Sequence, residues 1–318
     1  MKPLPETLDA LGAGGKAALA RTLTALETRA DDAALAALLD EAFEARHGAA
    51  LGLTGPPGVG KSSLTQALIG AFRGQGMTVA ILAVDPSSAR TGGAILGDRT
   101  RIDTDPDDGG VYMRSMAARG ALGGLSEIAF PAIVLMRALF DIVIVETVGV
   151  GQSEIEVAER TDGVVFCAQP GSGDALQFMK AGVMEIPDIV LVTKGDLGAL
   201  ATRAAADLRG ALSLDARGEK VSIAVVSAAT GAGIAEAVDL IRSRIVERAF
   251  TPEGLARRKR QGRGWLRGQI ASSHGRRGLA LIESQLTEEK PFSAKADRIR
   301  LLDEALADGW NARLAPPV

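Results

Sequence analysis

A glycine-rich segment that ends in lysine and serine is the strongest chemical signal in the sequence. Gly55-Pro56-Pro57-Gly58-Val59-Gly60-Lys61-Ser62 fits the spacing G-x-x-x-x-G-K-[ST], and Ser63 follows it. Glycines at these places let backbone amides turn toward phosphate oxygens, while the lysine reaches the outer phosphates and the first serine ligates Mg²⁺. The segment comes after a predicted strand and before a predicted helix. We therefore predict a P-loop that binds a nucleoside triphosphate with Mg²⁺.

Acidic residues follow apolar runs that we expect to form strands. Asp85 and Glu146 each come directly after such a run, and Asp98 lies in a glycine-rich segment between them. Ligands of an open α/β sheet bind at the carboxyl ends of its strands, so these acids are predicted near the metal and the γ-phosphate, with helix capping as their alternative role. Gly149 is placed to present its amide to the γ-phosphate and to release it after hydrolysis. The predicted metal ligands are Ser62, Asp85, Asp98 and Glu146, and the predicted catalytic residues are Lys61, Asp98 and Glu146.

Two short motifs further along the chain indicate which base is bound. Thr193-Lys194-Gly195-Asp196 ends another expected strand, and an aspartate there accepts both the N1 and the N2 hydrogens of guanine, a donor pattern that adenine lacks. Ser227-Ala228-Ala229-Thr230-Gly231 follows the last expected strand and offers the Ala228 amide to the guanine O6. Each motif alone is as consistent with an ordinary turn, but both occur in order after the P-loop. Together they predict GTP and GDP as the nucleotides.

These motifs lie in a part of the chain that alternates between short apolar runs and helix-like stretches. The apolar runs have strand length and suit a sheet covered on both faces; they span residues 49–54, 78–84, 141–145, 163–168, 189–192 and 222–226. The helix-like stretches between them complete the βαβ alternation of an α/β fold with a mostly parallel sheet; they include residues 62–72, 124–139 and 231–248. We expect three parts, an N-terminal helical extension (1–46), a P-loop nucleotide-binding domain (47–250) and a C-terminal helical segment (251–318).

Composition argues against several other classes of protein. The net charge of −3 and the 3% of aromatic residues speak against a nucleic-acid partner, which normally requires a basic excess and aromatic stacking platforms. One cysteine, Cys167, excludes an intrachain disulfide, and two histidines are too few for a histidine-based zinc site. The N-terminus lacks signal-peptide features and no apolar run reaches the length of a membrane span. We therefore expect a cytoplasmic protein with no membrane partner.

Longer motifs resemble the MeaB/ArgK-type GTPases associated with methylmalonyl-CoA mutase, which belong with the metallochaperone-like P-loop GTPases. The resemblance covers roughly residues 15 to 270 and rests on Ala83-Val84-Asp85-Pro86-Ser87-Ser88, Thr91-Gly92-Gly93, Ile95-Leu96-Gly97-Asp98, Arg114-Ser115-Met116, Leu122-Gly123-Gly124 and the segment from Val145 to Glu154. It implies a GTPase chaperone that docks on an adenosylcobalamin-dependent acyl-CoA mutase, gates its cofactor loading and protects it. It also implies a homodimer formed through the C-terminal helices, and the same roles for the P-loop, the three acids and the guanine motif as given above.

The sequence departs from this family at several positions. The segment Gly171 to Lys180 matches a further switch that signals to the mutase, with Asp174 and Lys180 as relay residues, but the family pattern predicts an acid at Ala175 and a glycine near Phe178. It also predicts a histidine at Ala121 and an asparagine at Thr193. We expect threonine in place of the asparagine amide to remove a loop-bracing hydrogen bond, so that base specificity weakens less than affinity. A mutase other than the methylmalonyl enzyme is therefore an open alternative as the partner.

Two other functions remain to be separated from the mutase chaperone. A metal-insertion GTPase of the same group usually carries histidine or cysteine clusters, whereas Cys167 lies in an apolar run here and His47 and His274 stand far apart. A small-molecule kinase uses the same P-loop but needs no guanine motifs in that order. No arginine finger or water-positioning glutamine is assigned from the motifs, with Arg119 and Gln152 as guesses, so the chaperone hypothesis predicts slow intrinsic GTP hydrolysis.

Overall fold

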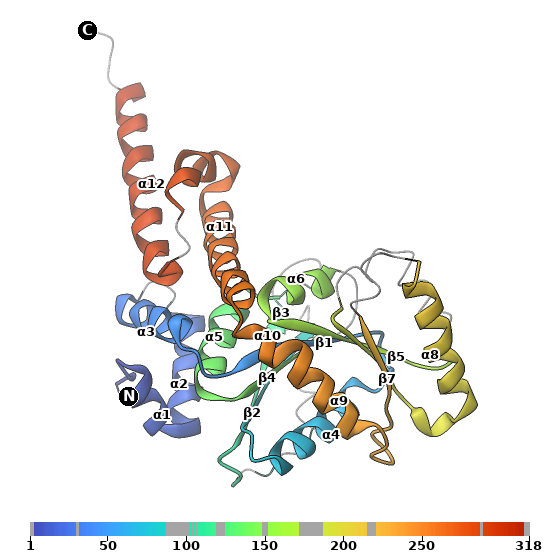
Figure 1. The fold of residues 1–318 in the computed structure, drawn as a ribbon. Helices are drawn as coiled ribbons and strands as arrows, with labels where there is room; N and C mark the ends of the chain where they lie inside the picture. Colours follow the sequence, from blue (N-terminus) through green and yellow to red (C-terminus); the bar gives the residue numbers. More distant parts are fainter. Residues whose placement is uncertain are drawn as a thin grey trace. The chain divides into compact units, whose positions relative to one another are not determined.

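The computed structural model describes residues 3–29, 32–86, 102, 105, 107–118, 125–147, 152–171, 187–214, 221–286 and 289–314. The chain divides into two compact units (Figure 1). Residues 46–254 form the first, which we call the sheet unit. Residues 1–45 and 255–318 form the second, which we call the helical unit. The two terminal segments of the chain therefore belong to one unit, and each unit is described by itself.

The sheet unit contains seven parallel strands, which confirms the α/β class with a mostly parallel sheet. In spatial order they are β3 (Val111–Ala118), β2 (Val79–Pro86), β4 (Ile142–Glu146), β1 (Ala49–Thr54), β5 (Gly163–Ala168), β6 (Ile189–Val192) and β7 (Ser222–Val225). All carboxyl ends lie at one edge because every pair is parallel. The crevice at that edge is where such sheets bind ligands.

Side chains of the strands alternate between two apolar faces. On one face, Leu51, Ile144 and Val165 pack with residues of α4 (Lys61–Gly74) and α9 (Ile234–Ile241). On the other, Phe166 and Val190 pack against α8 (Ala199–Leu212). The other helical pieces in the described part of the unit are α5 (Ala129–Leu139), α6 (Gln152–Arg160), η2 (Gly195–Leu197), η4 (Arg242–Val246) and α10 (Glu247–Ala249). Figure 1 shows α4 and α9 on one side of the sheet and α6 on the other. The near-continuous apolar runs are thus explained by burial on both faces.

β3 is the strand that the apolar runs did not predict. Its sequence, Val-Tyr-Met-Arg-Ser-Met-Ala-Ala, interrupts the apolar pattern with Arg114 and Ser115. β3 is the last strand at its end of the sheet and pairs only with β2, in the register Val79 with Val111. An edge strand is covered less completely than a central one, so it tolerates polar residues and lacks the signal of a buried strand.

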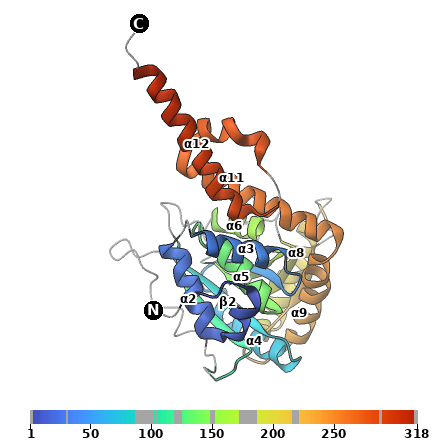
Figure 2. The same ribbon diagram turned by 90° about the vertical axis from the view of Figure 1, so that its left-hand side faces the viewer.

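The helical unit is built from both ends of the chain. It comprises α1 (Leu8–Ala13), α2 (Gly15–Thr28), α3 (Ala33–Glu44), α11 (Pro252–Ile282, kinked at Gly275), η5 (Glu283–Gln285) and α12 (Pro291–Leu314). α11 and α12 lie side by side around Leu266, Ile270 and Leu302 (Figure 2). The Asp40 carboxylate of α3 accepts the Phe292 and Ser293 amides, both at 3.0 Å, at the start of α12. This cap joins residues 252 positions apart.

No helix in the described part of the chain is long and apolar enough to cross a membrane.

Candidate functional site

The predicted P-loop connects the carboxyl end of β1 to the first residue of α4. Gly55, Gly58 and Gly60 have φ angles of 140°, 75° and 99°, a region that other residues rarely adopt. Gly55 is restricted twice, because a Cβ there would lie 2.4 Å from the carbonyl oxygen of Cys167. The loop therefore lies directly against β5 and ends at the amino terminus of α4, whose free amides and positive dipole end favour phosphate.

Lys61 is held inside the loop that it follows. Lys61 is only 8% exposed. Its Nζ donates to the carbonyl oxygens of Gly55 at 2.7 Å and Pro56 at 3.1 Å. These two carbonyl oxygens accept hydrogen bonds that the ammonium group could otherwise donate to a phosphate. A nucleotide that enters this loop must therefore compete with two backbone acceptors for the same ammonium group.

Glu146, at the carboxyl end of β4, joins the strand to the P-loop helix. Its Oε1 accepts from Ser62 Oγ at 2.8 Å, and its Oε2 accepts from Thr65 Oγ1 at 3.0 Å. The residue is only 5% exposed, so both hydroxyls solvate a carboxylate that water hardly reaches. The predicted metal ligands Ser62 and Glu146 thus lie in direct contact, and their hard oxygen donors fit Mg²⁺. Thr65 was not foreseen, although it lies one helical turn from Ser62 on the same face.

The structure describes the other two predicted acids, Asp85 and Asp98, less completely than Glu146. Ala83 of β2 pairs with Glu146 of β4, and Asp85 continues β2 two residues further at the same edge of the sheet. The backbone therefore brings Asp85 and Glu146 to neighbouring strand ends, while the side chain of Asp85 is outside the described set. Asp98 and Gly149 lie outside the described residues, as do Arg119, Ala121, Asp174, Ala175, Phe178 and Lys180; for Gln152 only the backbone is described.

The predicted guanine motif is hydrogen-bonded to the P-loop. Thr193 Oγ1 lies 2.7 Å from the Val59 carbonyl oxygen and 3.0 Å from that of Ala168. Lys194 Nζ donates to the Gly58 carbonyl oxygen at 3.1 Å and to Gln169 Oε1 at 2.6 Å. The expectation that threonine removes the bracing hydrogen bond is therefore wrong, because its hydroxyl reaches the P-loop carbonyl without an amide. Gln169 is a further member of the site that no motif indicated.

Asp196 and Ser227 bring the two base-reading motifs together. Ser227 Oγ donates to Asp196 Oδ1 at 2.7 Å, and this bond, then the backbone amide of Asp196 itself, holds the pKa of the carboxyl below its ordinary value. Asp196 is exposed, whereas Ser227 is fully buried, and Ala228 and Ala229 follow in the same loop. An ionised carboxylate at the surface of this loop is the acceptor that guanine recognition requires.

Cys167 lies beneath the loop rather than within it. The thiol is fully buried in β5, and burial raises its pKa to about 12, so it is neutral at physiological pH. A neutral, buried thiol is neither a nucleophile nor a metal ligand. Its residue acts through the backbone, whose carbonyl oxygen sets the close approach of Gly55.

A family model described as methylmalonyl Co-A mutase-associated GTPase MeaB matches residues 19–276, most of the chain. The chain belongs to the MeaB family. A probable GTPase of Mycobacterium bovis is 38% identical to this MeaB-family chain over 82% of it and 81% of the relative. A putative GTPase of Pyrococcus horikoshii is 43% identical over 62% of each chain, so the match spans about three fifths of that relative. A crystal structure of an LAO/AO transport system kinase is 26% identical and covers 94% of this chain and 96% of its own, with a TM-score of 0.63.

Family membership agrees with the geometry of the nucleotide loops. The family model is described as a GTPase, and the P-loop, Glu146 and the Asp196–Ser227 pair lie at the carboxyl edge of the parallel sheet. Within the described residues, no three histidine, cysteine or acidic side chains gather as a metal site.

Proposed function

We propose that this MeaB-family protein is a Mg²⁺-dependent GTP hydrolase that acts as a switch and chaperone for an adenosylcobalamin-dependent acyl-CoA mutase. The hydrolase part is supported most by the contact of Ser62 Oγ with Glu146 Oε1 at 2.8 Å, because it places two hard oxygen ligands together at the mouth of the P-loop. The mutase part is supported by membership of a family of methylmalonyl-CoA mutase-associated GTPases.

In this proposal, each residue of the candidate site has a separate role. Lys61 leaves the Gly55 and Pro56 carbonyl oxygens and donates to the β- and γ-phosphate oxygens. Ser62 and Glu146, which are hydrogen-bonded to each other here, would hold Mg²⁺ together with Asp85 and Asp98. When bound, Mg²⁺ neutralises charge that develops on the transferred phosphoryl group. Asp196 accepts the guanine hydrogens, while the Ala228 amide and Gly149 contact the base oxygen and the γ-phosphate.

Glu146 is also the point at which the nucleotide state would reach the rest of the protein. Its carboxylate bonds the P-loop helix, and the next residue, Thr147, donates its amide to Leu53 of β1 at 3.2 Å. If Ser62 bound a metal ion, its hydrogen bond to Glu146 at the end of β4 would change. We therefore place the start of the switch at Glu146.

Hydrolysis is tested by steady-state phosphate release from GTP with Mg²⁺. Lys61→Ala is expected to abolish nucleotide binding and turnover with the fold retained, because the loop loses the ammonium group that the P-loop motif directs to the phosphates. Lys259→Ala, a lysine of α11, serves as the matched control. Normal GTP turnover by Lys61→Ala would remove the P-loop from the mechanism.

The partner is tested by adding a cobalamin-dependent acyl-CoA mutase from the same source to the hydrolysis assay. We expect slow turnover alone and stimulation by the mutase. Slow turnover without stimulation would keep the hydrolase and reject this partner, whereas rapid turnover alone would contradict the switch. Size-exclusion chromatography with light scattering tests the homodimer that we infer through residues 251–318, and fractionation tests the cytoplasmic location.

A small-molecule kinase is the second candidate function, since this chain is similar over 94% of its length to an LAO/AO transport system kinase. The exposed Asp196 carboxylate favours GTP, since adenine has no donors at the same positions. Competition between GTP and ATP decides between them, and equal affinities would favour the kinase. Metal insertion would instead be indicated by a transition metal that copurifies in stoichiometric amount.

A further inference from the structure

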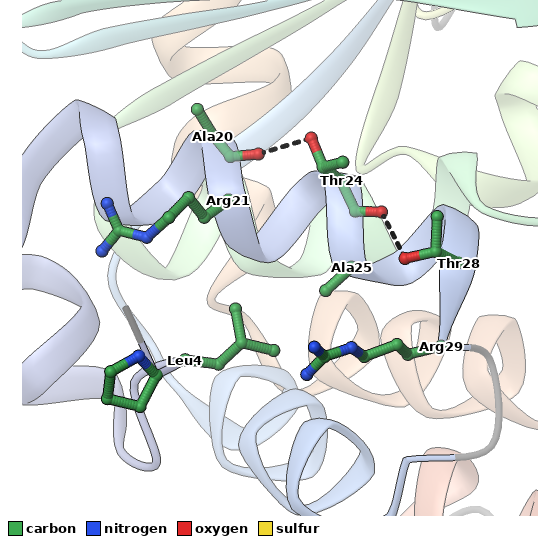
Figure 3. Close-up of a pocket in the computed structure, with 8 residues that line it drawn as sticks. Leu4, Ala20, Arg21, Thr24, Ala25, Thr28 and Arg29 are labelled. Carbon is green, nitrogen blue, oxygen red and sulfur yellow. Dashed lines mark hydrogen bonds between the residues drawn. The ribbon is translucent and has the colours of Figure 1, made fainter. Parts of the chain in front are cut away.

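A pocket of about 340 Å³ lies in the helical unit, outside the nucleotide site. It is lined by Pro3 and Leu4 of the N-terminal segment and by residues of α2 from Ala20 onward, with Arg29 just after the helix (Figure 3). This volume is at the lower end of the range of small-molecule sites. No lining residue is acidic and none is aromatic. The charged groups that line the pocket are therefore both cationic, and the apolar lining is aliphatic.

The Nε atom of Arg21 is the polar group of the pocket that a ligand could satisfy. Its Nε is buried without a hydrogen-bond partner, and Arg21 forms no ion pair with any residue in the described ranges. A buried donor that is left unpaired costs free energy, and a bound anion removes that cost. In Figure 3 the guanidinium groups of Arg21 and Arg29 stand on opposite sides of Leu4, with Ala25 directed toward the space between them.

The other polar groups of the pocket are already engaged or weakly held. The hydroxyls of Thr24 and Thr28 donate to the carbonyl oxygens of Ala20 at 2.9 Å and Thr24 at 3.3 Å. Arg29 lies 4.0 Å from Asp32, and its side chain is 48% exposed, so this ion pair contributes little. Asp32 also caps α3 through the Ala34 and Leu35 amides. The two arginines thus supply the recognition.

The shape and the charges select the class of ligand. Without an aromatic side chain the pocket offers no stacking surface for a nucleotide base, whereas Leu4 and Ala25 suit an aliphatic chain. Arg29 follows the C-terminal end of α2, where the negative end of the helix dipole opposes a dianion such as phosphate more strongly than a monoanion. We propose that this pocket binds an aliphatic monocarboxylate, with its carboxylate on Arg21 and its chain against Leu4 and Ala25.

Ligand-observed NMR titration of the full-length protein tests the site, with octanoate as the probe and acetate and inorganic phosphate as comparisons. Octanoate should bind saturably and more tightly than either comparison. Arg21→Gln should raise its Kd about tenfold or more, as expected for loss of a charge-assisted hydrogen bond, and Ala25→Leu should block the pocket. Arg277→Gln, an exposed arginine of α11 in the same unit, should leave the Kd unchanged.

Several results would overturn the proposal. An unchanged octanoate affinity in Arg21→Gln would remove the arginine as anchor, and phosphate binding as tight as octanoate would mean a simple anion site. Absence of saturable octanoate binding would reject the pocket as a site for this class of ligand. If Ala25→Leu unfolds, as circular dichroism would show, the comparison of Arg21→Gln with Arg277→Gln still decides.

Discussion

Replacing Thr193 by valine tests whether the hydrogen bond between the base-reading loop and the P-loop contributes to nucleotide affinity. The hydroxyl lies 2.7 Å from the Val59 carbonyl oxygen in a residue that is 4% exposed, and valine keeps the shape while removing the donor. A net hydrogen bond contributes about 1 kcal/mol, and a buried acceptor left unpaired costs about 1 to 3 kcal/mol. If about 1.4 kcal/mol of this reaches the nucleotide site, the affinities for GTP and GDP each fall about tenfold.

The assay is displacement of a fluorescent GDP analogue by GTP, GDP and ATP. We expect the ratio of GTP to ATP affinity to stay constant in Thr193→Val, because Asp196 still reads the base. Thr161→Val is the matched control, since this fully buried hydroxyl lies 2.7 Å from the Val157 carbonyl oxygen and 3.1 Å from that of Gly163, at the amino end of β5. It should lose stability but not affinity. The reasoning is refuted if Thr193→Val binds GTP as tightly as Thr161→Val does, or if selectivity collapses together with affinity.

Three further predictions follow from individual contacts. Because burial raises the pKa of Cys167 to about 12, native protein at pH 8 should resist iodoacetamide and unfolded protein should react, as mass spectrometry will show; rapid native labelling would contradict the burial. The lowered pKa of Asp196 keeps it ionised as pH falls, so Ser227→Ala should move the acid-side loss of GTP affinity to higher pH, measured by titration between pH 7 and 4; coincident curves would count against this bond. Asp40→Ala should lower the stability of the helical unit by about 1 to 2 kcal/mol in thermal unfolding, and an unchanged midpoint would mean the cap contributes nothing.

Most of the sheet could be predicted because its strands are buried on both faces. The apolar runs 163–168 and 189–192 coincide with β5 and β6, and the run 49–54 coincides with β1. β3 escaped because an edge strand need not be uniformly apolar. The predicted helix 231–248 contains a π-helical turn, η4, and such one-residue irregularities leave no clear mark in periodicity.

The arrangement of the candidate site could be predicted where it depends on residue type and spacing, and was missed where it depends on contacts between distant segments. The P-loop and the position of Glu146 after a strand follow from the motif and the βαβ pattern. The engagement of Lys61 by Gly55, the bond from Thr193 to Val59 and the position of Gln169 arise only when β1, β5 and β6 lie next to one another. Comparison with an asparagine-containing motif even gave the wrong expectation at Thr193, because a hydroxyl can do the same work as an amide.

The cap between Asp40 and the start of α12 has a consequence for how the chain is made. The two partners are 252 positions apart, so at roughly 5 to 20 residues per second the ribosome needs about 10 to 50 s between them. Residues 46–254 of the sheet unit are made within that time, whereas the contact between the rings of Phe43 and Phe292, at 6.2 Å between their centroids, must wait for residue 292. α3, one of the first helices to leave the ribosome, therefore gains part of its packing only at the end of synthesis, and truncation before residue 291 removes both the amides that Asp40 binds and the ring that packs against Phe43.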